Sequence, residues 1–93
     1  MKVAVMTLRL CTPWAHSLKE KRMVVKSLVT RLQNTFHVSA AEIGAQDAHQ
    51  ILEIGIAAVV PHQAMADSLM EEISRFVEEN CEGEILEEIR EMR

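Results

Sequence analysis

The sequence predicts an α+β domain in which four strands and two helices follow one another in the order βαββαβ. Apolar and polar side chains alternate over residues 2–10 and 51–60, as they do in strands with one buried face. Apolar side chains recur at helical spacing over residues 18–36 and 62–80. With 93 residues the chain has the size of one domain, which we assign to residues 1–93.

The first half of the chain is predicted to supply two strands and one helix. Residues 2–10 form the first strand, and the helix over residues 18–36 carries one apolar stripe. Residues 37–43 form the second strand, and a polar loop at residues 44–50 follows it. The stripe of the first helix consists of Leu18, Val25, Leu28, Val29, Leu32 and Phe36.

The second half is predicted to supply two more strands and a second helix. Residues 51–60 are apolar enough for a central strand, and Pro61 ends that strand at the entry to a helix over residues 62–80. Gly83 is a stop signal for this helix, and the charge-rich residues 84–92 suit an edge strand. Right-handed crossovers then give a ferredoxin-like sandwich, whose antiparallel sheet has the strand order 4-1-3-2 and both helices on one face.

The composition is that of a globular protein with an uneven distribution of charge. The net charge is −4, yet residues 1–37 carry +6 and residues 66–93 carry −7. Such asymmetry marks either a nucleic-acid surface or two neighbouring elements that neutralise each other. The two cysteines lack metal-ligand spacing, so we expect free thiols in a reducing, intracellular location. The apolar runs are too short to span a membrane.

The stretch His16 to Arg22 is the most informative part of the sequence. Ser17 and Glu20 have the spacing of a capping box, in which each side chain accepts a hydrogen bond from a backbone amide at the start of a helix. A helix N-terminus already carries partial positive charge, and several cationic side chains add to it here. The candidate anion- or RNA-binding surface consists of Lys19, Lys21, Arg22 and Lys26, with Trp14 and His16 beside them.

This surface has two interpretations. A helical period places Lys19, Arg22 and Lys26 on one strip beside the apolar stripe, where they can hold phosphates while Trp14 offers a stacking platform. The same strip can instead form surface ion pairs with the acidic residues of the second helix. Trp14 can instead cap the end of the core. The two central strands contain no aromatic residue, which excludes base stacking on the sheet as a mode of RNA recognition.

The sheet face opposite the helices is predicted to be apolar. Small aliphatic side chains dominate it, and charged side chains are expected only at Arg9, Glu42, Glu53 and Glu87. A face of this kind is rarely left in water, so we expect a second copy of the chain to cover it. The candidate interface residues are Val3, Val5, Ala57 and Val59, together with either Ala40 or Ala41.

A small-molecule or metal-dependent enzyme is the alternative from another functional class. Asp47 and His49 lie in the loop between the second and third strands, where they could ligate a metal or act as acid and base. Two residues fall short of a metal site, and Asp47 is more readily explained as shaping a turn. We therefore assign no catalytic residue, metal or cofactor.

The stretch from His16 to Arg22 resembles the hallmark of the YlxP-like family of small bacterial proteins of unassigned function. The resemblance implies a ferredoxin-like fold and a cytoplasmic location. The family's genes tend to lie beside genes for translation initiation and ribosome maturation, which points to RNA or ribosomes. Further matching positions are Lys26-Ser27-Leu28, Phe36, Gln46-Asp47, Ala66-Asp67-Ser68 and Glu78-Glu79-Asn80.

The favoured function is that of a non-enzymatic binding protein. We expect it to form a dimer or a larger homo-oligomer through the open sheet face. Through the first helix it is expected to bind RNA or a ribosomal particle weakly, and added salt should weaken this binding further. No membrane partner is expected.

Overall fold

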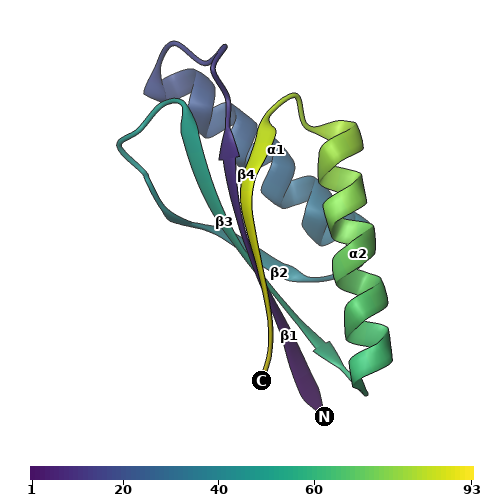
Figure 1. Cartoon of the computed structure of the whole chain (residues 1–93). Coiled ribbons are helices and arrows are strands. Elements are labelled where there is room, and N and C mark those ends of the chain that lie inside the picture. The colour runs from purple at the N-terminus through teal and green to yellow at the C-terminus, as the bar shows by residue number, and fades with distance from the viewer.

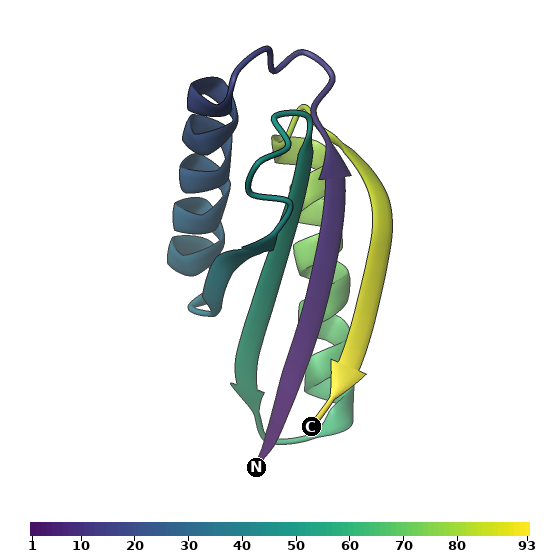
Figure 2. The same ribbon diagram turned by 90° about the vertical axis from the view of Figure 1, so that its left-hand side faces the viewer.

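A computed structural model describes all residues of the chain and has the predicted element order. The strands form one antiparallel sheet in the order β2-β3-β1-β4, which confirms the predicted ferredoxin-like arrangement. The helices α1 and α2 lie on one side of this sheet (Figure 1). From the other side the strands are uncovered, with α2 behind them and α1 beside β2 (Figure 2). The elements are β1 (Lys2–Cys11), α1 (Leu18–Phe36), β2 (Ser39–Gly44), β3 (Ile51–Val60), α2 (Gln63–Asn80) and β4 (Glu84–Met92).

The core lies between the sheet and the two helices. The central strands β1 and β3 pair over their full length. Alternate side chains of both strands therefore form a continuous apolar surface on the sheet face that the helices cover. Leu28 and Leu32 of α1 and Ile73 of α2 are buried against this surface. Phe36 and Phe76 meet edge to face with ring centroids 5.4 Å apart, which joins the end of α1 to α2. Neither helix is long and apolar enough to cross a membrane.

Three local features differ from the prediction at the ends of elements. His37 takes a left-handed conformation (φ 55°) and closes α1, so β2 begins at Ser39 rather than at residue 37. His62 lies outside α2 and caps it, because its Nδ1 accepts a hydrogen bond from the Met65 amide. Gly83 does not adopt a left-handed φ; its lack of a side chain instead allows close packing, since a Cβ there would lie 3.0 Å from the Cys11 carbonyl oxygen.

An ion pair of Arg90 links the edge strand β4 to α2. Its guanidinium lies 3.1 Å from the Glu71 carboxylate on α2 and 2.7 Å from the Glu88 carboxylate on β4. Desolvation by burial lowers the pKa of Arg90, but the hydrogen bonds to Glu71 and Glu88 outweigh it and leave this pKa raised. The charges of β4 therefore hold the strand in place as well as protecting an edge.

Candidate nucleic-acid interface

Helix α1 begins at the predicted cap. Ser17 has an extended backbone, and its Oγ accepts a hydrogen bond of 3.1 Å from the Glu20 amide. The Glu20 carboxylate reaches back to the amide of His16, at 3.2 Å, rather than to that of Ser17. The start of α1 is thus fixed by two side chains, and the His16 side chain remains exposed.

Replacing Ser17 with alanine is expected to lower the free energy of unfolding by about 1 kcal/mol, the usual value for a lost N-cap. Urea denaturation of both proteins measures this difference. Ser68→Ala, at an exposed position within α2, serves as the control and should change stability by less than about 0.5 kcal/mol. An unchanged midpoint for Ser17→Ala would mean that the hydroxyl does not stabilise the helix.

Lys21 does not belong to the candidate anion-binding surface, contrary to the prediction. Its side chain is completely buried (0% exposed) between α1 and β2. The Lys21 ammonium donates a hydrogen bond of 2.6 Å to the carbonyl oxygen of Ala45 and lies 2.7 Å from a carboxylate oxygen of Glu42. A buried cation needs such partners, and these two hold it where no ligand from solvent reaches it.

The strip formed by Lys19, Arg22 and Lys26 is exposed along α1. None of the ion pairs in the structure involves these side chains, so the acidic residues of α2 do not neutralise them. Gln33 lies on the same flank of α1 and donates a hydrogen bond to the Ala40 carbonyl oxygen of β2, at 3.2 Å. On the opposite flank, Arg31 reaches α2. The strip therefore lies on the β2 side of α1, away from α2. Trp14, which was expected beside the strip, lies on the opposite flank of α1, towards the end of α2.

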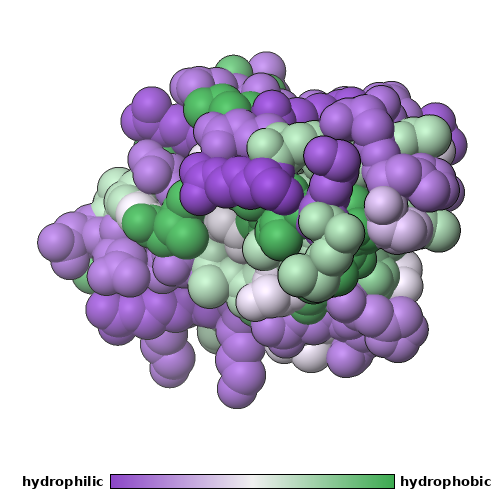
Figure 3. All heavy atoms as spheres, turned by 90° about the horizontal axis from the view of Figure 1, so that it is seen from below, coloured by the Kyte–Doolittle hydropathy of each residue, from purple (hydrophilic) through white to green (hydrophobic).

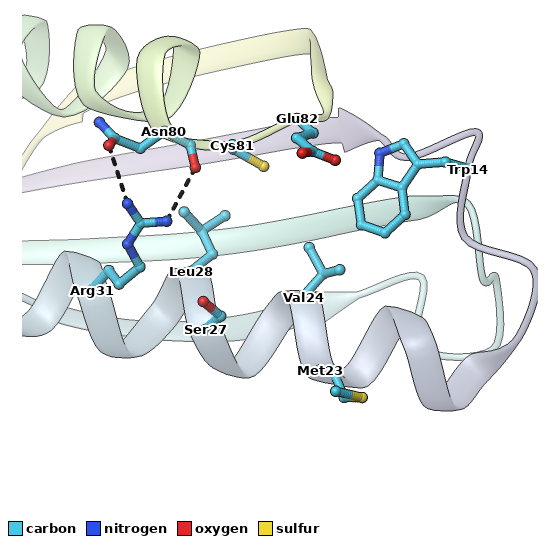
Figure 4. A pocket seen from close by; sticks show the side chains of 9 residues that line it. All are labelled: Trp14, Met23, Val24, Ser27, Leu28, Arg31, Asn80, Cys81 and Glu82. Carbon is cyan, nitrogen blue, oxygen red and sulfur yellow. Dashed lines mark hydrogen bonds between the residues drawn. The ribbon is translucent and has the colours of Figure 1, made fainter.

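A groove between α1 and the C-terminal end of α2 was not foreseen from the sequence (Figure 4). It has a volume of about 320 Å³. Trp14 and Glu82 lie at one end, and Arg31 lies at the other, where it binds the backbone and side-chain oxygens of Asn80 at 3.1 Å each. The groove is lined by Trp14, Met23, Val24, Ser27, Leu28, Arg31, Asn80, Cys81 and Glu82.

A family model described as "Protein of unknown function (DUF503)" matches residues 3–90. The chain belongs to this family. It is 44% identical over 64 residues to the uncharacterized protein YlxP of Bacillus subtilis (strain 168), covering 69% of this chain and 70% of that protein. The resemblance to YlxP-like proteins is thus confirmed.

A solved structure gives independent support for the fold of this DUF503 chain. A de novo designed protein with ferredoxin fold, determined by solution NMR, superimposes with a TM-score of 0.56. The match covers 100% of this chain and 85% of the designed one. At 15% sequence identity, this likeness shows the fold alone.

The loop of the DUF503 chain that holds Asp47 and His49 is tied to the loop after β1. His49 Nδ1 lies 3.1 Å from the Ala15 carbonyl oxygen, and Gln50 donates a side-chain hydrogen bond to the Pro13 carbonyl oxygen at 3.1 Å. Asp47 is exposed, and no group of three histidine, cysteine or acidic residues comes together in a position to hold a metal. The contacts of His49 thus join two loops, and neither residue becomes part of a larger cluster.

The open sheet face of the DUF503 chain carries the predicted interface residues. Val3, Val5 and Ala57 are half-buried, and Val59 is 70% exposed. At the end of the molecule where both termini lie, hydrophobic side chains are grouped near the middle, and hydrophilic ones lie around and across them (Figure 3).

Strand β2 settles the choice between two alanines on this face. Ala41 is exposed there, whereas Ala40 is buried beneath the helices. Glu42, expected on the open face, points to the helix side like Ala40 and pairs with Lys21. The open face therefore lacks Glu42 but carries Glu91, which lies opposite Val5.

Proposed function

We propose that this protein is a non-enzymatic, cytoplasmic RNA-binding protein that engages RNA or a ribosomal particle through the outer flank of α1. The observation that carries this proposal is the strip of Lys19, Arg22 and Lys26, three exposed cations without a carboxylate partner in an acidic protein. Cations without a carboxylate partner can bind phosphates without first breaking an intramolecular ion pair.

The surroundings of the strip favour weak binding. It starts in the first turns of α1, where unpaired amide groups add partial positive charge. Lys21, directly beneath the surface, is neutralised by Glu42 and adds little to the field. The acidic α2 lies beyond α1, and salt screens its repulsion over a Debye length of about 8 Å at physiological ionic strength. Affinity in the micromolar range or poorer is expected.

Self-association through the open sheet face is the second part of the proposal. On the open face Val5 lies between Ala57 of β3 and Glu91 of β4, and Glu91 is paired with Arg93 at 2.9 Å. The charged row of Arg9, Glu53 and Glu87 crosses the sheet farther along β1. Two copies that meet at the end of the face formed by Val3, Val5 and Val59 would cover these valines. The charged row of each copy would then remain in water.

Replacing Lys19, Arg22 and Lys26 together with serine is expected to weaken RNA association at least about tenfold, because three phosphate contacts are lost. Binding of labelled single-stranded RNA measures the change. Affinity purification from lysate, with and without nuclease, shows whether ribosomal RNA accompanies the wild-type protein only.

A matched control removes three cations outside α1: Lys2, Arg75 and Arg93, all exposed. This control lowers the net charge equally and should retain most of the binding. If the α1 variant binds RNA as well as the wild type does, or if both variants lose binding equally, the strip is not the binding surface.

A further inference from the structure

The groove beside α1 combines an aromatic ring with a carboxylate that has no partner. Trp14 is 38% exposed, and the Glu82 carboxylate lies next to its indole ring (Figure 4). Glu82 takes part in no ion pair of the chain, and no side-chain hydrogen bond reaches it. A carboxylate only accepts hydrogen bonds, so this end of the groove fits a flat group that presents donors.

Two cations lie near the groove: Arg31 at the end away from Trp14, and Lys26 on the outer side of α1. A second hollow continues from the groove over α1 and is lined by Lys26 and Arg31 together with Met23, Ser27 and Thr30. Lys26 belongs to the strip, and Arg31 bonds only to uncharged oxygens of Asn80 and lies 5.5 Å from the centre of the Phe76 ring. The positive charge of Arg31 is therefore not neutralised by a carboxylate. An anion attached to the flat group could interact with both Lys26 and Arg31.

We propose that the groove holds an unstacked guanine base of single-stranded RNA. The base stacks on Trp14, its N1–H and exocyclic amino group donate to Glu82, and an adjoining phosphate lies near Lys26 and Arg31. Guanine is the one RNA base with two adjacent donors on its Watson–Crick edge. In adenine, cytosine and uracil, each donor on this edge is flanked only by acceptors. A volume of about 320 Å³ is at the lower end of the range of ligand pockets and suits one nucleotide. This inference rests on the proposed RNA-binding function.

An arginine or lysine side chain of a partner protein is the competing occupant. It also offers donors and a cation that an indole ring attracts. Such a segment would approach a groove that ends at Arg31 and adjoins the hollow lined by Lys26, so like charges would oppose it. A nucleotide combines the donors with a negative charge, and it therefore matches both ends of the groove.

The test compares two uridine oligoribonucleotides that differ only in one central nucleotide, guanosine or adenosine. Because Trp14 is the only tryptophan of the chain, its fluorescence reports directly on stacking in the groove. The guanosine oligonucleotide is expected to quench Trp14 and to bind about tenfold more tightly than the adenosine one. Glu82→Gln should abolish this preference, whereas Glu79→Gln, an exposed charge-matched control outside the groove, should retain it.

The outcomes separate this inference from the proposed function. If both oligonucleotides bind equally and the triple serine variant weakens both, the guanine site is wrong and the α1 strip remains the RNA surface. If neither oligonucleotide binds, both proposals fail. In that case, quenching of Trp14 by an arginine-containing peptide would assign the groove to a protein segment instead.

Discussion

Replacing Lys21 with methionine is expected to lower the free energy of unfolding by about 3 kcal/mol. Methionine fills most of the space of the lysine chain, so the loss comes from the groups left behind. The Ala45 carbonyl oxygen and the Glu42 carboxylate, whose side chain is only 19% exposed, would both lose their partner. This partial exposure of Glu42 places the effect at the lower end of the values for broken buried ion pairs, about 3–5 kcal/mol. For a domain with roughly 5–15 kcal/mol of total stability, the loss is large.

Two further variants test the physical cause of this loss. Lys19→Met, at an exposed position of the same helix, should change stability by less than about 0.5 kcal/mol. The double variant with Lys21→Met and Glu42→Leu should regain much of the stability, because it removes the uncompensated charge together with its partner. Chemical denaturation measures all three. A Lys21→Met protein as stable as the wild type would show that the buried pair does not hold α1 to β2.

Replacing Val5 with lysine is expected to weaken self-association at least about tenfold. Val5 lies on β1 between Ala57 of β3 and Glu91 of β4, and the charge of a lysine there would have to be buried between two copies. Light scattering and sedimentation over a range of concentrations measure the effect. The wild-type protein should be a dimer or larger at micromolar concentration.

Asn34→Lys, at an exposed site on α1, adds the same charge away from the sheet and should leave the oligomer intact. A wild-type protein that stays monomeric at high concentration would contradict self-association. The same holds if both lysine variants weaken the oligomer equally, because net charge rather than the sheet face would then be responsible.

The fold could be predicted because the relevant signals are local. The alternation in β1 and the capping residues Ser17 and Glu20 each depend on a few neighbouring residues, and the structure follows them closely. Strand β2 was harder, because Ala40 and Ala41 give no alternation that fixes which face is buried. For this reason Glu42 was expected on the wrong side of the sheet.

The burial of Lys21 had one signal in the sequence. At 100° per residue it lies about 300° from Leu18, inside the apolar stripe between Leu28 and Leu32. Lysine is almost never fully buried without a partner, and the partner Glu42 comes from another element, so only tertiary structure reveals the pair.

The groove had no local signal at all. Trp14 precedes α1 and Glu82 follows α2, and only the packing of the two helices brings these residues together. No periodicity or motif connects positions so far apart in the sequence. A stacking role for Trp14 was considered because it precedes the cationic first turns of α1 in the sequence, but its neighbouring carboxylate was not foreseen.

The salt dependence of RNA binding tests most directly whether the α1 strip contacts phosphates. In a plot of the logarithm of the binding constant against the logarithm of salt concentration, each contact with single-stranded RNA contributes a slope of about −0.7. The variant with serine at Lys19, Arg22 and Lys26 should therefore show a slope shallower by about 2 than that of the wild type. The control lacking Lys2, Arg75 and Arg93 should keep the wild-type slope. Equal slopes for the wild type and the α1 variant would contradict an RNA-binding role for the strip.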